Sequence, residues 1–432
     1  MTDDRLHRAI SDSLSDLASG SPTDYIEDVL AVTARTRQRP AWTFPGRYLT
    51  MTPALRFAAI AILAVSASLG VAALVSEPAP DAPAVGECPP PAASAGPPAS
   101  LAPGTTPAPI VIGDCEPWIA YDWFVGEDVT GTPAVKAVRP DGSDAHVVAH
   151  ASESHFVDWT HDGARLAFTK WDGGPDVASI WTVNADGSGE QRLVGCEQPC
   201  MQLYGASWSP DDSKLVVSRW DKPEGTNLGQ RCYLETVDVA TLERTVILEG
   251  PEGGTELECY YTPRWSGDGR SIVFEHADYL LDFVSGEDTL TGSSIAIIDA
   301  DGPSDQEPRI LTDPALLATH PDWHPNEDRI VLGTRGLGDF QDVWLATNLY
   351  TIRPDVTDLR QVTSYGNREV RATFPTWTPD GQEIVFSYVE PTTGDLSGDW
   401  GHRQLAFIKP DGSGLRVVPG VNGVEPRLRP LP

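Results

Sequence analysis

Aromatic and imidazole side chains that could hold a ligand stand at nearly constant distances before a repeated tryptophan. His155, Tyr204 and Tyr261 each lie four positions before a Trp, and His320 lies three positions before one. Such groups around a common opening bind ligands by ring stacking and hydrogen bonding. Similar residues also fill the centre of a repeat protein by simple packing, and the sequence leaves that interpretation open.

Motifs that would identify a catalytic site do not occur in the sequence. It contains no G-x-S-x-G elbow, no H-E-x-x-H pair, no Walker loop and no dinucleotide-binding glycine pattern. The acidic residues Asp299, Asp301, Asp305 and Glu307 lack the register of an EF-hand calcium loop. We therefore predict no catalytic residue, no cofactor and no metal. A hydrolase or lyase that uses histidines in a central channel is an alternative.

The candidate residues precede a phrase that recurs along the chain. Trp-Ser/Thr-Pro-Asp-Gly, or a close variant, begins at Trp159, Trp208, Trp265, Trp323 and Trp377. An apolar strand follows each phrase, and later turns often contain Asp-Gly, which favours hairpins because Gly accepts a positive φ. This pattern predicts four-stranded antiparallel units that bury their faces against one another.

The two ends of the repeat region predict a closed ring. Five units contain the phrase, and residues 118–149 supply three more strands without an inner one. Residues 424–428 (Val-Glu-Pro-Arg-Leu) match 261–265 (Tyr-Thr-Pro-Arg-Trp) and can supply the missing strand. Pairing the chain ends would make six blades and remove free sheet edges.

The phrase, the Leu/Ile-x-Phe strand after it and the Asp-Gly-Ser turns resemble the WD40-like repeat of the TolB-type six-bladed β-propeller family. Two phrases depart from that repeat, with Asp212 in place of Gly and Asn326-Glu327 in place of Asp-Gly. The resemblance implies an all-β six-bladed propeller of four-stranded antiparallel blades over 111–432. It also implies a binding habit, although members of the family differ in what they bind.

An apolar segment indicates a membrane-anchored variant of this family. Residues 57–75 contain no charged residue and are long enough to cross a bilayer, so we predict a transmembrane helix over 54–75. Arginines precede this segment and no Lys or Arg follows it before Lys136, which favours a cytoplasmic N-terminus and an extracytoplasmic propeller. A cleaved signal peptide is the alternative.

The regions on either side of the predicted span differ in composition. Residues 1–53 are expected to form a partly helical cytoplasmic segment, in which 23–39 could bind a cytoplasmic protein. Residues 76–110 are rich in Pro and Ala, which predicts a semi-rigid linker. A tail, an anchor and an outer domain also resemble the layout of bacterial anti-sigma regulators, without the His/Cys zinc motif that many of those contain.

All six cysteines follow the predicted span. This distribution favours disulfides in an oxidising compartment, because the cysteines lack the close histidines of a common zinc site. The expected pairs are Cys196 with Cys200, Cys232 with Cys259, and Cys88 with Cys115.

Extra chain length is expected on one face of the propeller. The turns between strands a and b and between c and d are short, whereas the connections on the opposite, looped face include the long segments 221–230, 277–292, 335–347 and 390–402. Recognition surfaces of repeat proteins commonly lie on such a face.

The net charge of -31 argues against nucleic acid as a partner, because phosphate backbones are bound by clustered Lys and Arg. The sequence favours a protein, peptide or glycan binding module that is tethered to the cell membrane by one helix. A transmembrane regulator that senses an outer ligand is the second hypothesis, and the channel enzyme is the third.

Overall fold

Antiparallel β-strands make up almost all of the structure, which is a computed structural model. The described residues are 116–123, 134–150, 154–171, 177–222, 229–252, 256–281, 288–335, 347–365, 370–390 and 402–431. They contain 24 strands and one short 3-10 helix, η1 (Pro314–Leu316). No helix within these ranges is long and apolar enough to span a membrane. The predicted segments 1–53, 54–75 and 76–110 lie outside the described residues.

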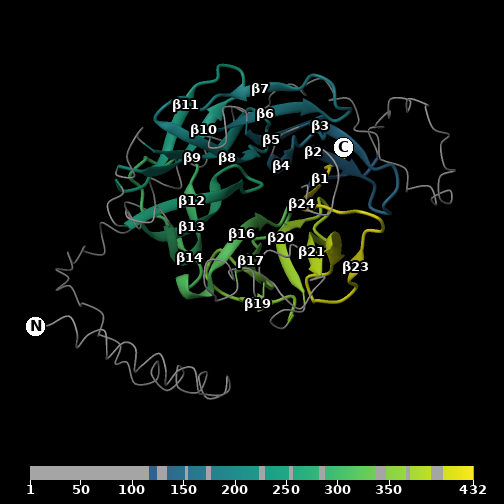
Figure 1. Ribbon diagram of the computed structural model, residues 1–432. Coiled ribbons are helices and arrows are strands. Elements are labelled where there is room, and N and C mark those ends of the chain that lie inside the picture. The colour runs from purple at the N-terminus through teal and green to yellow at the C-terminus, as the bar shows by residue number, and fades with distance from the viewer. Residues whose placement is uncertain are drawn as a thin grey trace, which may run out of the picture. The chain divides into compact units, whose positions relative to one another are not determined.

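The strands form a ring of four-stranded groups, with strand a innermost and strand d outermost (Figure 1). Blade 1 consists of β4 (Ser154–Trp159), β5 (Arg165–Trp171), β6 (Ala178–Asn184) and β7 (Gln191–Val194). Blade 2 consists of β8 (Cys200–Trp208), β9 (Lys214–Asp221), β10 (Arg231–Asp238) and β11 (Arg244–Glu249). Blade 3 consists of β12 (Glu256–Trp265), β13 (Ser271–Leu281), β14 (Asp288–Asp299) and β15 (Arg309–Ile310).

The remaining strands complete the ring. Blade 4 consists of β16 (Ala318–Trp323), β17 (Ile330–Thr334), β18 (Leu349–Ile352) and β19 (Arg360–Gln361). Blade 5 consists of β20 (Arg371–Trp377), β21 (Ile384–Glu390), β22 (His402–Ile408) and β23 (Arg416–Val417). Blade 6 consists of β24 (Val424–Leu428), β1 (Ile119–Trp123), β2 (Ala134–Val138) and β3 (His146–His150). One parallel bridge, Ala178 to Gln202, also joins blades 1 and 2 into an eight-stranded sheet.

Blade 6 confirms the predicted closure of the ring. The C-terminal β24 pairs antiparallel with the N-terminal β1, with Ile119 opposite Leu428 and Ala120 opposite Arg427. The sheet order β24-β1-β2-β3 makes the last strand of the chain the innermost strand of a blade whose other three strands come first in the sequence. The edges that an open row of blades would expose are therefore covered.

Aromatic side chains fill the spaces between neighbouring blades. The Phe of the Leu/Ile-x-Phe strand is fully buried in blades 1, 3 and 5, as Phe168, Phe274 and Phe386. Two tryptophans of the phrase also donate hydrogen bonds from Nε1 across a blade boundary: Trp159 to the Arg427 carbonyl at 3.1 Å, and Trp323 to the Arg264 carbonyl at 3.2 Å. The repeated aromatic residues thus hold adjacent blades together.

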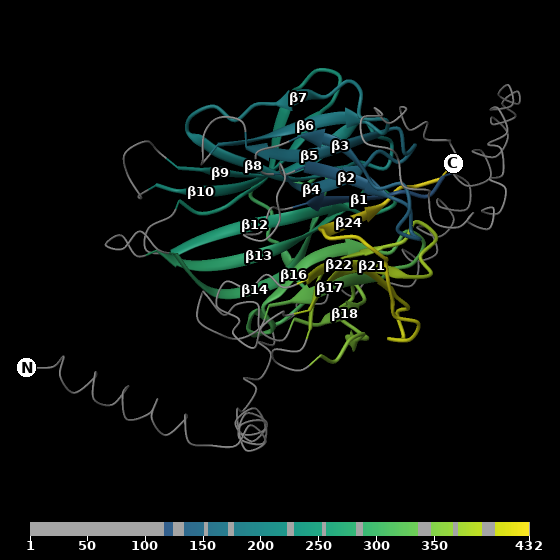
Figure 2. The ribbon, with the colours of Figure 1, turned by 45° about the vertical axis from the view of Figure 1, so that its right-hand side comes forward.

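Blade 3 has the longest strands of the described region. Strand β13 has 11 residues and β14 has 12, and the hairpin that they form can be followed in Figure 2. The sequence predicted a loop over 277–292, but cross-strand pairs continue as far as Leu281 opposite Asp288. The predicted insertion is therefore mostly an extension of the two strands. Alternating apolar residues in 277–281 were too few to distinguish strand from loop.

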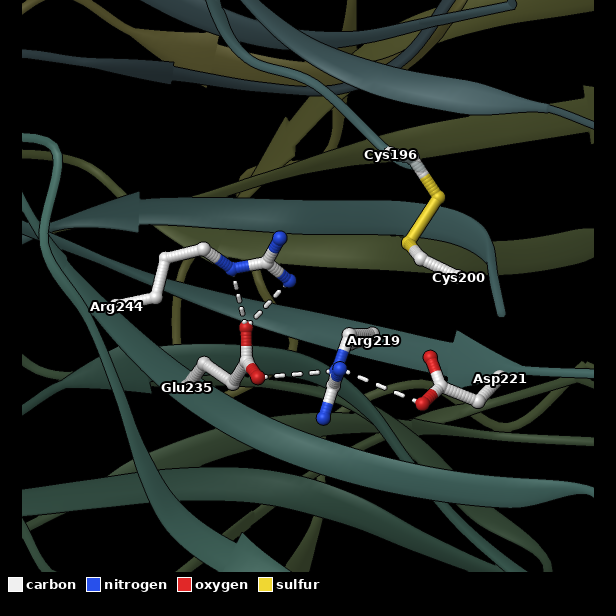
Figure 3. Close-up of a disulfide and its surroundings, with 6 residues drawn as sticks. All are labelled: Cys196, Cys200, Arg219, Asp221, Glu235 and Arg244. Atoms are coloured by element: carbon white, nitrogen blue, oxygen red, sulfur yellow. Dashed lines mark hydrogen bonds and ion pairs between the residues drawn. A yellow bond between two sulfur atoms is a disulfide. The ribbon is translucent and has the colours of Figure 1, made fainter. Parts of the chain in front are cut away.

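Two of the three predicted disulfides are present. Cys196 and Cys200 close a short loop between blades 1 and 2, and Figure 3 shows this bond beside the ion pairs of blade 2. Those pairs centre on the buried Glu235, which lies 2.9 Å from Arg219 Nε. Cys232 of β10 is bonded to Cys259 of β12 and joins blades 2 and 3. Cys259 lies within a strand rather than in the predicted loop, and the third predicted pair lies outside the described residues.

Aspartates of the Trp phrase close the turns between strands a and b. In blade 2, Asp211 Oδ1 accepts hydrogen bonds from the Ser209 hydroxyl at 2.7 Å and from the Ser213 amide at 3.1 Å. These bonds, led by the one from Ser209, lower the pKa of Asp211 to about 2. Asp212, which replaces Gly, adopts a φ of 57° and accepts a hydrogen bond from the His161 amide of blade 1 at 2.9 Å.

The turn aspartates predict a defined acid dependence. Because the pKa of Asp211 is lower in the folded protein than in the unfolded chain, its contribution to stability is complete above about pH 5 and is lost as the pH falls toward 2. We expect Asp211→Asn to lower the unfolding temperature at pH 5 and to match the wild type near pH 2. Thermal melts across this range measure the difference, and a constant offset at every pH would contradict the assignment.

Candidate functional site

A repeated irregularity of the inner strands shapes the centre of the propeller. One residue in each inner strand has a positive φ, three positions before the Trp of the phrase or, in β24, before Leu428. Strand pairing is interrupted at the same place in all six blades. The positions are Phe156, Gly205, Thr262, His320, Phe374 and Glu425, with φ between 46° and 68°. A bulge of this kind redirects the side chain, and its recurrence means that the fold enforces a conformation that non-glycine residues rarely adopt.

The bulged residues surround a cavity at the centre of the ring. Five of the six bulged residues line it: Phe156, Thr262, His320, Phe374 and Glu425. The cavity has a volume of about 20 Å³, which accommodates about one water molecule. A pocket for an organic ligand of ordinary size has about 300 to 1,000 Å³. This cavity is therefore too small to be a substrate site.

Charged residues directly before the Trp position complete the cavity wall. Arg427 of blade 6 lies between two carboxylates, with Nη1 2.9 Å from Asp322 Oδ1 and Nε 3.3 Å from Asp158 Oδ1. Arg264 of blade 3 approaches Asp322 Oδ1 to 3.9 Å and donates a hydrogen bond to the Ala206 carbonyl at 3.2 Å. Two guanidinium groups thus balance two carboxylates in the interior.

These charges join the blades to one another. The second carboxylate oxygen of Asp158 accepts a hydrogen bond from the Trp208 amide of blade 2 at 3.0 Å. In the same way, Asp322 accepts one from the Trp377 amide of blade 5 at 2.8 Å. Burial, followed by repulsion from Arg427, lowers the pKa of Arg264 to about 10, which leaves it protonated at neutral pH. The carboxylates of Asp158 and Asp322 are therefore committed to structural contacts.

An aromatic cluster extends from the bulged residues. The Tyr204 and Tyr261 rings stack at 5.4 Å, and Tyr261 meets Tyr279 edge-on at 6.3 Å. Phe156 lies 6.2 Å from Tyr204 and 6.3 Å from His320. On the other side, His320 contacts the Phe374 ring at 4.2 Å. Residues of five inner strands and of β13 thus form one continuous aromatic cluster.

The tyrosines of this cluster lead to a buried ion pair. Tyr204 contacts Tyr261, Tyr261 contacts Tyr279, and Tyr279 interacts with the Arg335 guanidinium. Arg335 Nη2 lies 2.8 Å from Oε1 of Glu275, a fully buried residue of β13. We call these five residues, with His320, the mouth cluster.

The protonation states in the mouth cluster follow from its contacts. The Thr319 hydroxyl donates to Glu275, so the 2.7 Å bond between Thr319 and His320 Nδ1 requires the hydrogen to be on Nδ1. Burial lowers the pKa of His320 to about 4 and raises the pKa values of Tyr204 and Tyr261 well above their usual range. At neutral pH the imidazole and phenols are uncharged, which suits hydrogen bonding and stacking better than proton transfer.

The structure brings together three of the four residues selected from the sequence. Tyr204 and Tyr261 are in contact, and His320 joins them through Phe156. The side chain of His155 is outside the described set. Whether the other three bind a ligand stays a prediction.

Sequence reasoning missed several members of the site. We favoured the position four before Trp, but the position that faces the cavity is three before it, where His320 lies. Four other residues at this position were therefore missed: Phe156, Thr262, Phe374 and Glu425. Glu275, Tyr279 and Arg335 come from strand b or its end, and the Trp phrase carries no signal for them.

Comparisons with known proteins support the fold alone. No protein-family model and no curated protein matches the chain. Among solved structures, the chain is similar to a hydrazine synthase of Kuenenia stuttgartiensis, with 13% identity and a TM-score of 0.52, over 73% of this chain and 46% of that one. It therefore spans about half of that protein's length.

Two further solved structures have lower similarity scores. One is an oligogalacturonate lyase in complex with manganese, at 18% identity and a TM-score of 0.40, over 69% of this chain and 73% of that one. The other is the β-propeller domain of the Trilobed protease from Pyrococcus furiosus, at 12% identity and a TM-score of 0.40, over 70% of this chain and 83% of that one. The closed ring of four-stranded antiparallel blades makes the described part of the chain a β-propeller, while TolB-type membership stays a prediction.

The charged residues at the cavity predict a large effect of one substitution. Arg427→Met would leave Asp158 and Asp322 without their shared cation, so we expect a loss of about 3–5 kcal/mol in the free energy of unfolding. The matched change Arg360→Met removes an ion pair with Asp358 from a side chain that is 65% exposed and should cost less than about 1 kcal/mol. Denaturant unfolding followed by tryptophan fluorescence compares them, and equal losses would refute the role of Arg427.

Proposed function

We propose that this protein is a ligand-binding β-propeller that recognises a protein, peptide or glycan at the mouth cluster. The observation that carries the proposal is the cluster of Tyr204, Tyr261 and Tyr279 rings beside Arg335 on the looped side of the ring. Three phenol rings provide stacking surface, and their hydroxyls provide neutral hydrogen-bonding groups. This combination suits sugar rings or the side chains and carbonyl groups of a peptide.

The position of the mouth cluster along the strands supports binding from the looped face. Tyr204 and Tyr261 precede the bulge of their inner strands, while Tyr279 and Arg335 lie toward the ends of strand b. Each inner strand runs away from the looped face and each strand b runs back toward it, so these residues share the looped side of the ring. The side chain of Arg335 is 24% exposed and can meet a ligand there.

Binding is better supported than catalysis by the charges in the site. Glu275 is fully buried and paired with Arg335, and the two aspartates at the cavity accept bonds from backbone amides and arginines. A hydrolase or lyase needs an acid or base that reaches its substrate. His320, the remaining candidate in the cluster, has a pKa lowered to about 4 by burial, which makes it a weak base at neutral pH.

The membrane anchor is a separate part of the proposal and rests on the sequence. The apolar segment 54–75, the arginines before it and the linker 76–110 support a cell-membrane protein with the propeller outside. The regulator hypothesis depends on a partner for 23–39, which lies outside the described residues.

A matched pair of tyrosine substitutions tests the binding site. We expect Tyr279→Phe, which keeps the ring and removes the hydroxyl that bonds to Arg335, to weaken binding by up to about tenfold, the cost of one hydrogen bond. Tyr350→Phe, outside the cluster, should leave the affinity unchanged. The measurement uses the full chain against immobilised arrays of oligosaccharides and peptides.

The arrays also separate the proposal from its alternatives. Equal affinity of both variants for every captured probe would exclude the mouth cluster as the binding site. Conversion of a captured oligosaccharide or peptide to products, abolished by His320→Gln, would instead identify an enzyme.

A further inference from the structure

A histidine and two carboxylates meet on neighbouring strands of blade 3, apart from the mouth cluster. Glu258 lies in β12, and His276 and Asp278 lie in β13. The strand register places Glu258 directly opposite Asp278 and Tyr260 opposite His276. Residues two apart on a strand share a face, so the ladder brings all three side chains together. Their ligand atoms lie within 4.8 Å of one another.

His276 Nε2 makes one long hydrogen bond in this group, and the spacing of the three side chains also fits a shared ion. His276 Nε2 lies 3.3 Å from Glu258 Oε2 and 3.8 Å from Asp278 Oδ1. A charge-assisted hydrogen bond would be about 2.7–2.9 Å long. Around a tetrahedral Zn²⁺, with bonds of about 2.0–2.2 Å, neighbouring ligand atoms lie about 3.4 Å apart. Small side-chain adjustments would bring all three atoms to that spacing.

The local charge also calls for a cation. Like charges directly opposite each other in a sheet are destabilising. Among the described residues, the ion-pair contacts of Glu258 and Asp278 are both with His276, whose Nε2 can donate one hydrogen and cannot satisfy both carboxylates. A divalent ion would neutralise the pair and use the imidazole as a ligand.

The surroundings hold the three side chains in place. Glu258 precedes Cys259, whose disulfide to Cys232 fixes this part of β12 to blade 2. The Tyr260 ring packs against His276 at 5.5 Å. Gly292 lies opposite Asp278 in β14, where an added Cβ would meet Pro314 Cβ at 3.1 Å and Asp278 Oδ2 at 3.4 Å. Glycine at this position therefore allows Pro314 and the Asp278 carboxylate to approach the strand closely.

We propose that Glu258, His276 and Asp278 form a binding site for one Zn²⁺ ion. One nitrogen and two carboxylate oxygens are ligand types that borderline divalent metals accept, and Zn²⁺ is a member of that class without redox chemistry. Glu258 and Asp278 are 44% and 43% exposed, so water or a ligand group completes the coordination. The sequence had predicted no metal, because a Glu and a His 18 positions apart form no recognised motif.

Calorimetric titration of the purified, untagged full chain with Zn²⁺ alone tests the site. We expect the wild type to bind one ion per chain. His276→Gln or Glu258→Gln should weaken that binding by about 100-fold or more, because replacing even a residue that only supports a metal ligand lowers metal affinity by about 10- to 100-fold. The matched control is His161→Gln. His161 also faces a carboxylate, Asp212, at 3.0 Å, but belongs to no three-residue group among the described residues.

Melting temperatures measured in EDTA show whether the variants fold as stably as the wild type, so that a loss of Zn²⁺ binding cannot be attributed to unfolding. The His276→Gln and Glu258→Gln variants should melt within a few degrees of the wild type when no metal is present, and added Zn²⁺ should raise the melting temperature of the wild type and of His161→Gln only. Absence of Zn²⁺ binding, equal binding by all four proteins, or equally tight Ca²⁺ binding that persists in His276→Gln would each overturn the proposal. Ca²⁺ serves as the oxygen-seeking comparison.

Discussion

Pairing of the last strand with the first is the constraint on which the rest of this structure depends. Strand β24 completes blade 6, and the same strand carries Arg427 into the centre, where it meets Asp158 of blade 1 and Asp322 of blade 4. Backbone hydrogen bonds between β24 and β1 close the ring, and the two ion pairs of Arg427 link blades near its centre. If β24 left its place, two buried carboxylates would lose their cation at the same moment as two sheet edges became exposed. Closure is therefore cooperative.

The central site follows from how the inner strands fit into that closed ring. Each inner strand bulges at the same position, and five of the six bulged residues line a cavity that admits about one water molecule. Phe156, His320 and Phe374 fill much of the space at the axis, so the proposed binding groups Tyr279 and Arg335 lie away from it, on the looped side. Rigidity at the axis and accessibility at the mouth are two results of the same packing.

The fold could be predicted from the sequence to a large extent, and the site to a smaller one. The Trp phrase and the Asp turns have local physical causes, namely a buried indole and an Asp that bonds two positions along, so they appear as short motifs. Cys232 and Cys259 were paired because the blade order brings their segments together. In contrast, the contacts of Glu275 with Arg335 and Thr319 join residues 60 and 44 positions apart, and nothing local to any of them signals the partner.

Comparison of the six blades with one another distinguishes positions that keep one residue type from positions where the residue varies. The turn position after Trp keeps Ser or Thr in four of the five phrases, and the one exception, His324, supplies a ring nitrogen that accepts a bond from the Asn326 amide. The bulge position, by contrast, holds Phe, Gly, Thr, His, Phe and Glu in turn. Backbone geometry is therefore repeated while the side chains that it presents are not. The centre of the ring is therefore regular in its backbone and irregular in its side chains, so the repetition of the strands does not extend to the groups that line the cavity.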